Sequence, residues 1–233
     1  ETGSRAAVLG GVTTVFEMPN SDPVTTTAER LLDKLARAKG RMACDYAFYI
    51  GGSAENAGML GDLERLPGCA GVKIFMGAST GSLLLADEEG LTRALRSGRR
   101  RISFHAEDEE RLQARKALAM PGRPETHPVW RDAACALLAG ERLMRLARAA
   151  GRQVHVLHAT TAEEMALYAL HRDIATVEVT VNHLTMTAPD CYERLGAYAQ
   201  MNPPVRDATH RAALWQAVAG GLIDAIGSDH APH

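Results

Sequence analysis

Histidine and acidic side chains recur at the ends of candidate strands in this chain. His105-Ala106-Glu107 closes one apolar segment, His158 closes another, and Asn182-His183 follows a third. Asp229 ends the last such segment, and His233 follows shortly after it. A single strand-end histidine is most often structural, but four strand ends of this kind are hard to attribute to accident. Because this mixture of imidazole and carboxylate suits Zn²⁺ and similar divalent metals, we predict a metal site.

Lys73 stands inside the apolar segment Val72–Met76. Burying a charged lysine costs free energy unless the amine is paired or chemically altered. At a strand edge, the alternative is that its long side chain reaches solvent and keeps the charge there. Burial lowers the pKa of a lysine and makes its amine a nucleophile. The amine can then form a Schiff base, or take up CO₂ as a carbamate whose two oxygens bridge two metal ions. The neighbouring histidine and aspartate residues favour the carbamate.

Seven segments with strand character must position these residues. The candidate strands are Val12–Met18, Ala43–Gly51, Gly71–Gly77, Arg101–Glu107, Gln153–His158, Ala175–Val181 and Asp224–Asp229. Helical patterns lie between them, at Thr25–Lys39, Val129–Ala150, Thr161–His171 and Asp207–Gly220. The Thr-x-x-Glu at Thr160–Glu163 predicts a capping box. Thr185–Arg206 is the longest irregular stretch, and such loops are usually functional.

Alternating strands and helices predict a parallel sheet with right-handed crossovers. A doubly wound sheet and a (β/α)8 barrel both fit, but no G-x-G-x-x-G follows the first strand. Seven strands in 233 residues suit a barrel that lacks one strand. In a barrel the catalytic groups lie at the C-terminal strand ends, where the candidate ligands are found.

His155 and His158 are three residues apart in one candidate strand. Their side chains should therefore point to opposite faces, so that only one reaches the site. We predict that this residue is His158, which is nearer to the C-terminal end. His155 is then a packing residue or a support for the ligands.

The composition excludes several classes of protein. Apolar residues form 46% of the chain and charged residues 23%, as in globular rather than disordered proteins. A net charge of −2 gives no basic excess for nucleic acid or an anionic membrane. No apolar run reaches the roughly 18 residues of a membrane span. The four cysteines form no CxxC pair, which predicts free thiols and a cytoplasmic protein.

Six motifs, in this order along the chain, resemble the cyclic amidohydrolases, and among them the dihydroorotases most closely. They are GVTTVFEMPNSDP, GVKIFMGASTG, FHAED, HVLHAT, MNPPVR and GSDHAPH. The resemblance implies a barrel with two zinc ions that hydrolyses a cyclic amide, interconverting dihydroorotate and N-carbamoyl-aspartate in pyrimidine biosynthesis. It also leads us to expect a small-molecule substrate, a homo-oligomer and aspartate carbamoyltransferase as a partner.

The resemblance also implies roles for individual residues. Lys73 would be the carboxylated lysine that bridges the metals, and His105 and His158 would bind the second metal. Asp229 would bind the first metal and act as the acid and base of the reaction. The residues implied for substrate binding are Asn20, Asn202 and His233.

The sequence departs from the family's pattern at two places. The family's first strand carries a His-x-His metal motif that no strand of this sequence supplies, and Asn182-His183 replaces a His-His pair. We therefore interpret residues 1–233 as strands two to eight of the (β/α)8 barrel of a longer enzyme, without the first strand, the C-terminal end of the barrel and the flanking β-sandwich. We expect this segment alone to be inactive.

Three alternatives stay open. An allantoinase or hydantoinase would use the same site on another cyclic amide, although Met18-Pro19-Asn20 favours a dihydroorotase. A metal-free, inactive dihydroorotase-like partner subunit is the second alternative, against which the retained Lys73, His105 and His158 argue. The third is an aldolase that forms a Schiff base on Lys73.

Overall fold

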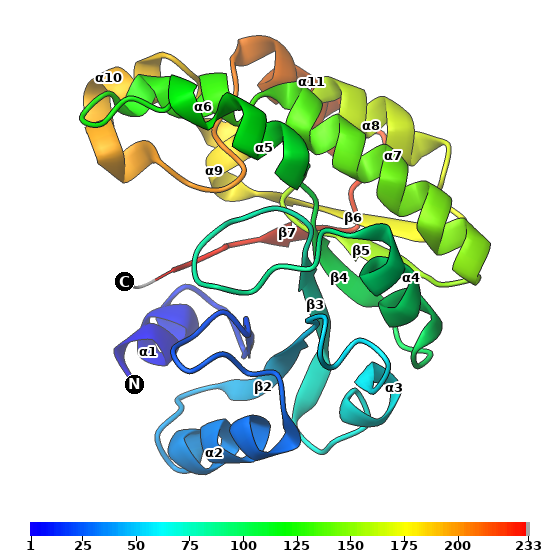
Figure 1. The fold of residues 1–233 in the computed structure, drawn as a ribbon. Coiled ribbons are helices and arrows are strands. Elements are labelled where there is room, and N and C mark those ends of the chain that lie inside the picture. The colour runs from blue at the N-terminus through cyan, green and yellow to red at the C-terminus, as the bar shows by residue number, and fades with distance from the viewer. Residues whose placement is uncertain (232–233) are drawn as a thin grey trace.

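Seven parallel strands form the centre of the computed structural model, which describes residues 1–231 (Figure 1). The strands pair in chain order from β1 to β7. They are β1 (Thr14–Glu17), β2 (Asp45–Gly51), β3 (Cys69–Phe75), β4 (Ile102–His105), β5 (Val154–Val156), β6 (Ala175–Thr180) and β7 (Ala225–Gly227). All seven predicted strands are confirmed, with ends that differ by a few residues.

Helices surround the curled sheet (Figure 1). They are α1 (Thr2–Leu9), α2 (Ala28–Ala38), α3 (Leu60–Leu63), α4 (Glu88–Arg96), α5 (Glu109–Arg115), α6 (His127–Trp130), α7 (Ala133–Ala150), α8 (Ala162–Ala169), α9 (Val181–Thr185), α10 (Asp190–Leu195) and α11 (Ala208–Ala219). Short 3₁₀ turns are η1 (Lys116–Leu118), η2 (Pro124–Thr126) and η3 (Gly196–Ala199). In the outer layer α4 packs on α7, α7 on α8, and α8 on α11. This is the predicted (β/α)8 architecture, with seven strands in the described residues.

The two faces of each strand have different environments. In β3, Val72 and Ile74 are fully buried against the outer helices and belong to the main apolar core. Burying a side chain of this size contributes about 1.5–3 kcal/mol. Since strand residues alternate between faces, Lys73 points the other way, toward the inside of the barrel. The apolar outer face thus fixes which residues line the interior.

Polar caps set where the helices begin. Asp207 caps α11 as predicted, by accepting hydrogen bonds from the backbone of the first turn. The capping box of α8 was predicted one residue too early: it joins Thr161 and Glu164. Glu164 is buried and accepts from the backbone N–H of Thr161 (3.0 Å), whereas the side chain of Glu163 is half exposed. Of the two adjacent glutamates, the buried one, Glu164, therefore forms the capping box.

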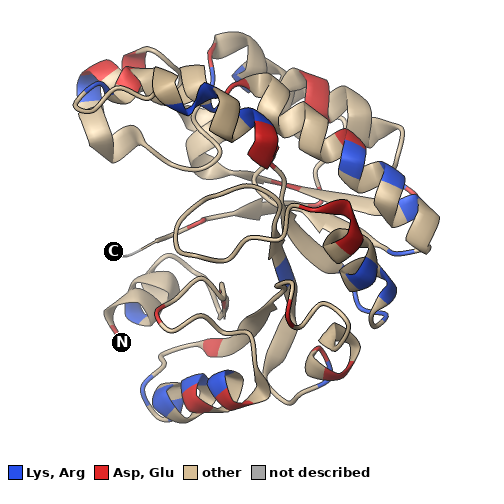
Figure 2. Cartoon of the chain, in the orientation of Figure 1, with Lys and Arg blue, Asp and Glu red and all other residues tan. Residues whose placement is uncertain are grey.

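The stretch from 185 to 206 is more ordered than the sequence predicted. It contains α10 and η3, which close over a small apolar cluster of Cys191, Tyr192, Ala199 and Val205. Outside the interior, charged residues gather on helices and loops (Figure 2). Within residues 1–231, no helix combines the length and the apolar character needed to cross a bilayer.

Candidate metal and substrate site

The structure brings the predicted residues of β3, β4 and β5 to one end of the sheet. Phe75 pairs with His105 in the β3–β4 register, which places Lys73 one layer below His105. His158 follows the end of β5. Lys73, His105 and His158 are 2%, 1% and 5% exposed. Three polar side chains are therefore enclosed at the place where barrel enzymes carry their chemistry.

The two histidines face one another directly. His105 Nδ1 lies 3.3 Å from His158 Nε2, and the ring planes are inclined by 75°. The other nitrogen of His158, Nδ1, is buried without a hydrogen-bond partner among the described residues. A buried polar atom with no partner costs free energy, so such an arrangement points to a functional site.

Backbone strain marks the same site. Within residues 1–231, His158 (φ 38°) and Asp229 (φ 45°) are the two non-glycine residues with positive φ. That conformation is uncommon outside glycine and concentrates at active sites. In both cases it turns a side chain at the end of a strand. The structure thus supports a special role for two of the predicted ligands.

Burial shifts the pKa values of the enclosed groups toward their neutral forms. Burial lowers the pKa of Lys73 from 10.5 to about 7, against the opposing charges of Asp229 and Glu178. Burial also lowers the pKa of His105 and holds that of His158 well below its usual range, and the charge of Lys73 adds to both effects. Metal ions bind neutral imidazole, so the two rings are in the state that ligation requires.

Asp229 lies at the open edge of the sheet. Its residue surface is exposed, but protein atoms on one side partly bury the carboxyl and raise its pKa, while the charge of Lys73 lowers it. A raised pKa brings a carboxyl closer to the range in which it can both accept and donate a proton.

The donor set fits a metal ion in kind but is incomplete on its own. Within residues 1–231, no group of three histidine, cysteine, aspartate or glutamate residues could hold a metal ion. His105 and His158 supply two nitrogen donors at the right end of the barrel. Lys73 carries no metal-binding lone pair until it is neutral, and a carbamate on its amine would add two oxygens. The fit therefore depends on modification of Lys73.

Asn20 and Asn202 both reach the loop after β3. Asn20 Nδ2 donates to the carbonyl oxygen of Thr80 (3.1 Å), and Asn202 Nδ2 contacts Ser79 Oγ (3.3 Å). The two predicted substrate residues therefore reach one short segment from loops that are distant in the chain. His233, the third predicted substrate residue, lies outside the described residues.

The prediction that His155 faces away from the interior is wrong. Its Nδ1 lies 2.8 Å from Thr176 Oγ1, and its Nε2 lies 3.7 Å from Glu178 Oε2, on the inner face of β6. The alternation rule failed because β5 ends at Val156 and the left-handed backbone at His158 turns that ring inward as well. His155 lies one layer deeper, below the ligands.

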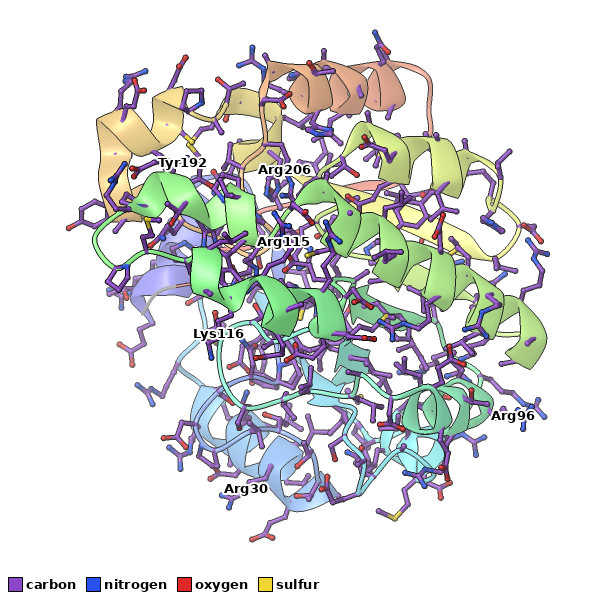
Figure 3. The ribbon with its side chains drawn as sticks, turned by 45° about the horizontal axis from the view of Figure 1, so that its top comes forward. Arg30, Arg96, Arg115, Lys116, Tyr192 and Arg206 are labelled. Atoms are coloured by element: carbon purple, nitrogen blue, oxygen red, sulfur yellow. The ribbon has the colours of Figure 1, made fainter. Side chains whose placement is uncertain are left out.

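Sequence reasoning missed three buried charged or polar groups. Glu107 and Arg131 form an ion pair beside His105, which the sequence hinted at only through the acidic residue of the His-Ala-Glu segment. Arg206 reaches into the interior, whereas Arg30 and Arg96 project from the periphery (Figure 3). Arg206 ends the MNPPVR motif, but no local pattern predicts the contacts of Arg131 or Arg206, because their partners are distant in the chain.

His183 was predicted without a definite role, and the structure gives it one. Its Nε2 donates to the carbonyl oxygen of Pro203 (3.0 Å), and its Nδ1 contacts Thr180 Oγ1 (2.8 Å). The buried ring thus ties the end of β6 to the loop that carries Asn202. Both ring nitrogens are occupied, so His183 has no lone pair to offer a metal.

Sequence and structure comparisons agree on the relatives of the chain. It is 34% identical over 245 residues to a dihydroorotase of Methanosarcina mazei, covering 100% of this chain and 53% of the relative. It is 34% identical over 245 residues to an allantoinase of Rubrobacter xylanophilus, covering 99% and 53%. The solved L-hydantoinase (dihydropyrimidinase) from Arthrobacter aurescens superposes with a TM-score of 0.89 at 30% identity, covering 97% of this chain and 52% of that one.

The chain spans about half the length of these relatives. The structural likeness extends over nearly all of the chain and confirms the predicted barrel architecture. No protein-family profile matches the chain.

Proposed function

Because the chain belongs to the cyclic amidohydrolase family, we propose that it carries most of the active site of a metal-dependent hydrolase that opens a cyclic amide. The observation that carries this proposal is the facing pair of buried imidazoles beside Lys73, whose lowered pKa values favour their neutral forms. Such a pair, with an unpartnered nitrogen on His158, serves little purpose in a purely structural core.

Four residues would hold the metal ions, for which we propose zinc. His105, His158 and Asp229 would be direct ligands, and Lys73 would become a further ligand once carboxylated. The amine of neutral Lys73 attacks the carbon of CO₂ and loses a proton, which leaves an anionic carbamate. When bound there, a metal ion would supply Lewis-acid chemistry for the amide carbonyl and the attacking water.

The remaining steps fall to side chains of the chain itself. Asp229 accepts the proton of the attacking water and delivers it to the ring nitrogen as the amide bond breaks. Without that proton the leaving group would be an amide anion, which leaves poorly. Asn20, Asn202 and His233 hold the ring in place, which removes the entropic cost of bringing the reactants together.

The substrate we propose is dihydroorotate, formed reversibly from N-carbamoyl-aspartate in pyrimidine biosynthesis. Met18-Pro19-Asn20 favours this choice, as do the dihydroorotases among the relatives. Hydantoinases and allantoinases also match along nearly the whole chain, so a hydantoin or allantoin is the alternative substrate.

We also propose how the chain relates to the complete enzyme. Strands β1 to β7 would be the second to eighth strands of the barrel, and residues 1–233 alone would be inactive. A cytoplasmic location, a homo-oligomeric assembly and aspartate carbamoyltransferase as partner belong to the same proposal.

A substrate panel tests the choice among these reactions. The protein at its natural length, incubated with Zn²⁺, would be assayed on dihydroorotate, hydantoin and allantoin. We expect turnover of dihydroorotate to exceed that of the other two by at least tenfold. Hydrolysis of allantoin or hydantoin without turnover of dihydroorotate would replace our choice of substrate but keep the reaction class.

A further inference from the structure

We propose that Glu107, held by Arg131, is a positioning residue that fixes which nitrogen of His105 is offered to the metal. On this proposal His105 carries its proton on Nε2, facing Glu107, and presents the lone pair of Nδ1 to the site. The inference rests on the proposed function, since it assigns a role toward the metal that the function requires.

The carboxylate of Glu107 lies wholly inside the protein, with no exposed side-chain surface. Its Oε2 atom is 2.9 Å from His105 Nε2, although the N–H bond points off the line to the oxygen. Arg131 approaches from the other side, with Nη2 at 2.5 Å and Nε at 3.1 Å from the same oxygen. Only 3% of the Arg131 side chain is exposed. Glu107 is thus enclosed between one cation and one imidazole.

The proton on His105 follows from this arrangement. An arginine offers only donors, so the carboxylate that pairs with Arg131 acts as an acceptor. An unprotonated Nε2 would set its lone pair against that oxygen at 2.9 Å, which is repulsive. Nε2 therefore carries the proton, and a neutral ring then keeps a free lone pair on Nδ1. Nδ1 is the nitrogen that faces His158.

The ion pair is anchored to other strand ends. Arg131 Nη2 also donates to the carbonyl oxygen of Ala78, in the loop after β3 (2.7 Å). The backbone oxygen of Arg131 accepts a hydrogen bond from Arg206, whose Nε donates to Thr160 Oγ1 after β5 (3.2 Å). The orientation of His105 is thereby tied to the segments that follow Lys73 and His158. A carboxylate fixed in this way can hold a metal-binding ring in one orientation and one tautomer.

The position of the proton on the His105 ring distinguishes a positioning role of Glu107 from a purely structural ion pair. A structural pair would stabilise the fold whichever nitrogen of His105 carried the proton. Nuclear magnetic resonance of the natural-length protein, labelled with ¹⁵N in its histidines, reads the proton position on each ring. His105→Asn assigns the signal. We expect a protonated Nε2 and an unprotonated Nδ1, both before and after addition of Zn²⁺. A proton on Nδ1 would overturn the inference, whether or not any variant folds.

Zinc titration supplies the second readout. Replacing Glu107 by glutamine should weaken Zn²⁺ binding by about 10- to 100-fold, the usual effect of removing a group that supports a metal ligand. The control is Glu110→Gln, the same change at an exposed position of α5, which should leave binding unchanged. Equal Zn²⁺ affinity in E107Q and the parent would overturn the inference and leave the proposed function standing. A parent protein that binds no Zn²⁺ would instead overturn the proposed function.

Discussion

His105 Nδ1 and His158 Nε2 lie 3.3 Å apart, although 53 residues separate them in the chain. Two nitrogen lone pairs at this distance repel unless a proton or a cation lies between them. We therefore expect the two residues to act as a unit. His105→Asn and His158→Asn should each lower the affinity for Zn²⁺ strongly, and the double variant should lose little more than either single one. Zinc titration of the three variants checks this, and additive losses would show that the rings bind independently.

Asp229 combines a proposed proton-transfer role with a left-handed backbone. Asp229→Asn should lower kcat by about 10²- to 10⁴-fold, because the amide cannot accept the proton. Asparagine tolerates positive φ almost as well as aspartate, so the unfolding midpoint should stay the same. Steady-state kinetics and urea unfolding measure the two effects. Full activity in D229N would remove the proton-transfer role.

A second pair of variants isolates the strain at this position. Asp229→Ala and Asp229→Gly remove the same carboxyl, but only alanine resists a φ of 45°. We expect the alanine variant to be less stable than the glycine variant by about 1–2 kcal/mol. Equal stability of the two would show that the backbone at Asp229 stores no strain.

We expect Lys73 to support metal binding and activity through its carbamate. Lys73→Ala removes the bridging oxygens, so we expect loss of bound zinc and partial recovery of both zinc and activity with millimolar short carboxylic acids. Elemental analysis with and without the acid gives the result. Unchanged zinc content in K73A would exclude the carbamate, and trapping of a carbonyl substrate on Lys73 by borohydride would favour the Schiff-base alternative.

Acid should lower the free energy of unfolding, because the buried His183 ring resists protonation in the folded protein. Burial lowers the pKa of this ring from 6.5 to about 4, so between these values the unfolded chain binds more protons than the folded one. The contribution is present in full above about pH 6.5 and is lost as the pH falls toward 4. The free energy of unfolding should drop by about 3 kcal/mol from this residue alone. Urea unfolding of the parent and His183→Gln at pH 7 and pH 4 measures it, and equal losses in both proteins would contradict the assignment.

The orientation of Asn202 should depend on a chain of hydrogen bonds. Trp130 Nε1 donates to His127 Nδ1 (3.3 Å), so His127 Nε2 carries the proton that reaches Asn202 Oδ1 (3.0 Å). Trp130→Phe removes the donor that holds Nδ1, so the ring is oriented less firmly toward Asn202, although the carbonyl oxygen of Met201 (3.0 Å) still keeps the proton on Nε2. We expect KM to rise about three- to tenfold with kcat nearly unchanged, as fits the loss of one neutral hydrogen bond. A fall in kcat at constant KM would place the effect on the chemical step instead.

The strands and the residues at their ends could be predicted because both depend on local sequence. Apolar segments located β3 and β4, and the barrel rule then placed His105 at the C-terminal end. Lys73 was recognised as a lysine inside an apolar segment. His155 could not be oriented in this way, because the turn at His158 depends on backbone dihedrals that no spacing encodes. The roles of Glu107 and Arg131 were equally hidden. Their ion pair joins residues 24 apart in the chain, and only the folded structure brings it to His105.

Above all, we propose that Lys73, His105, His158 and Asp229 together bind metal. The most direct test is the zinc content of the natural-length protein after incubation with Zn²⁺ and bicarbonate and removal of the excess, measured by elemental analysis. We predict about two zinc ions per chain, and markedly less in His158→Asn. A chain that folds but retains no metal under these conditions would contradict the account.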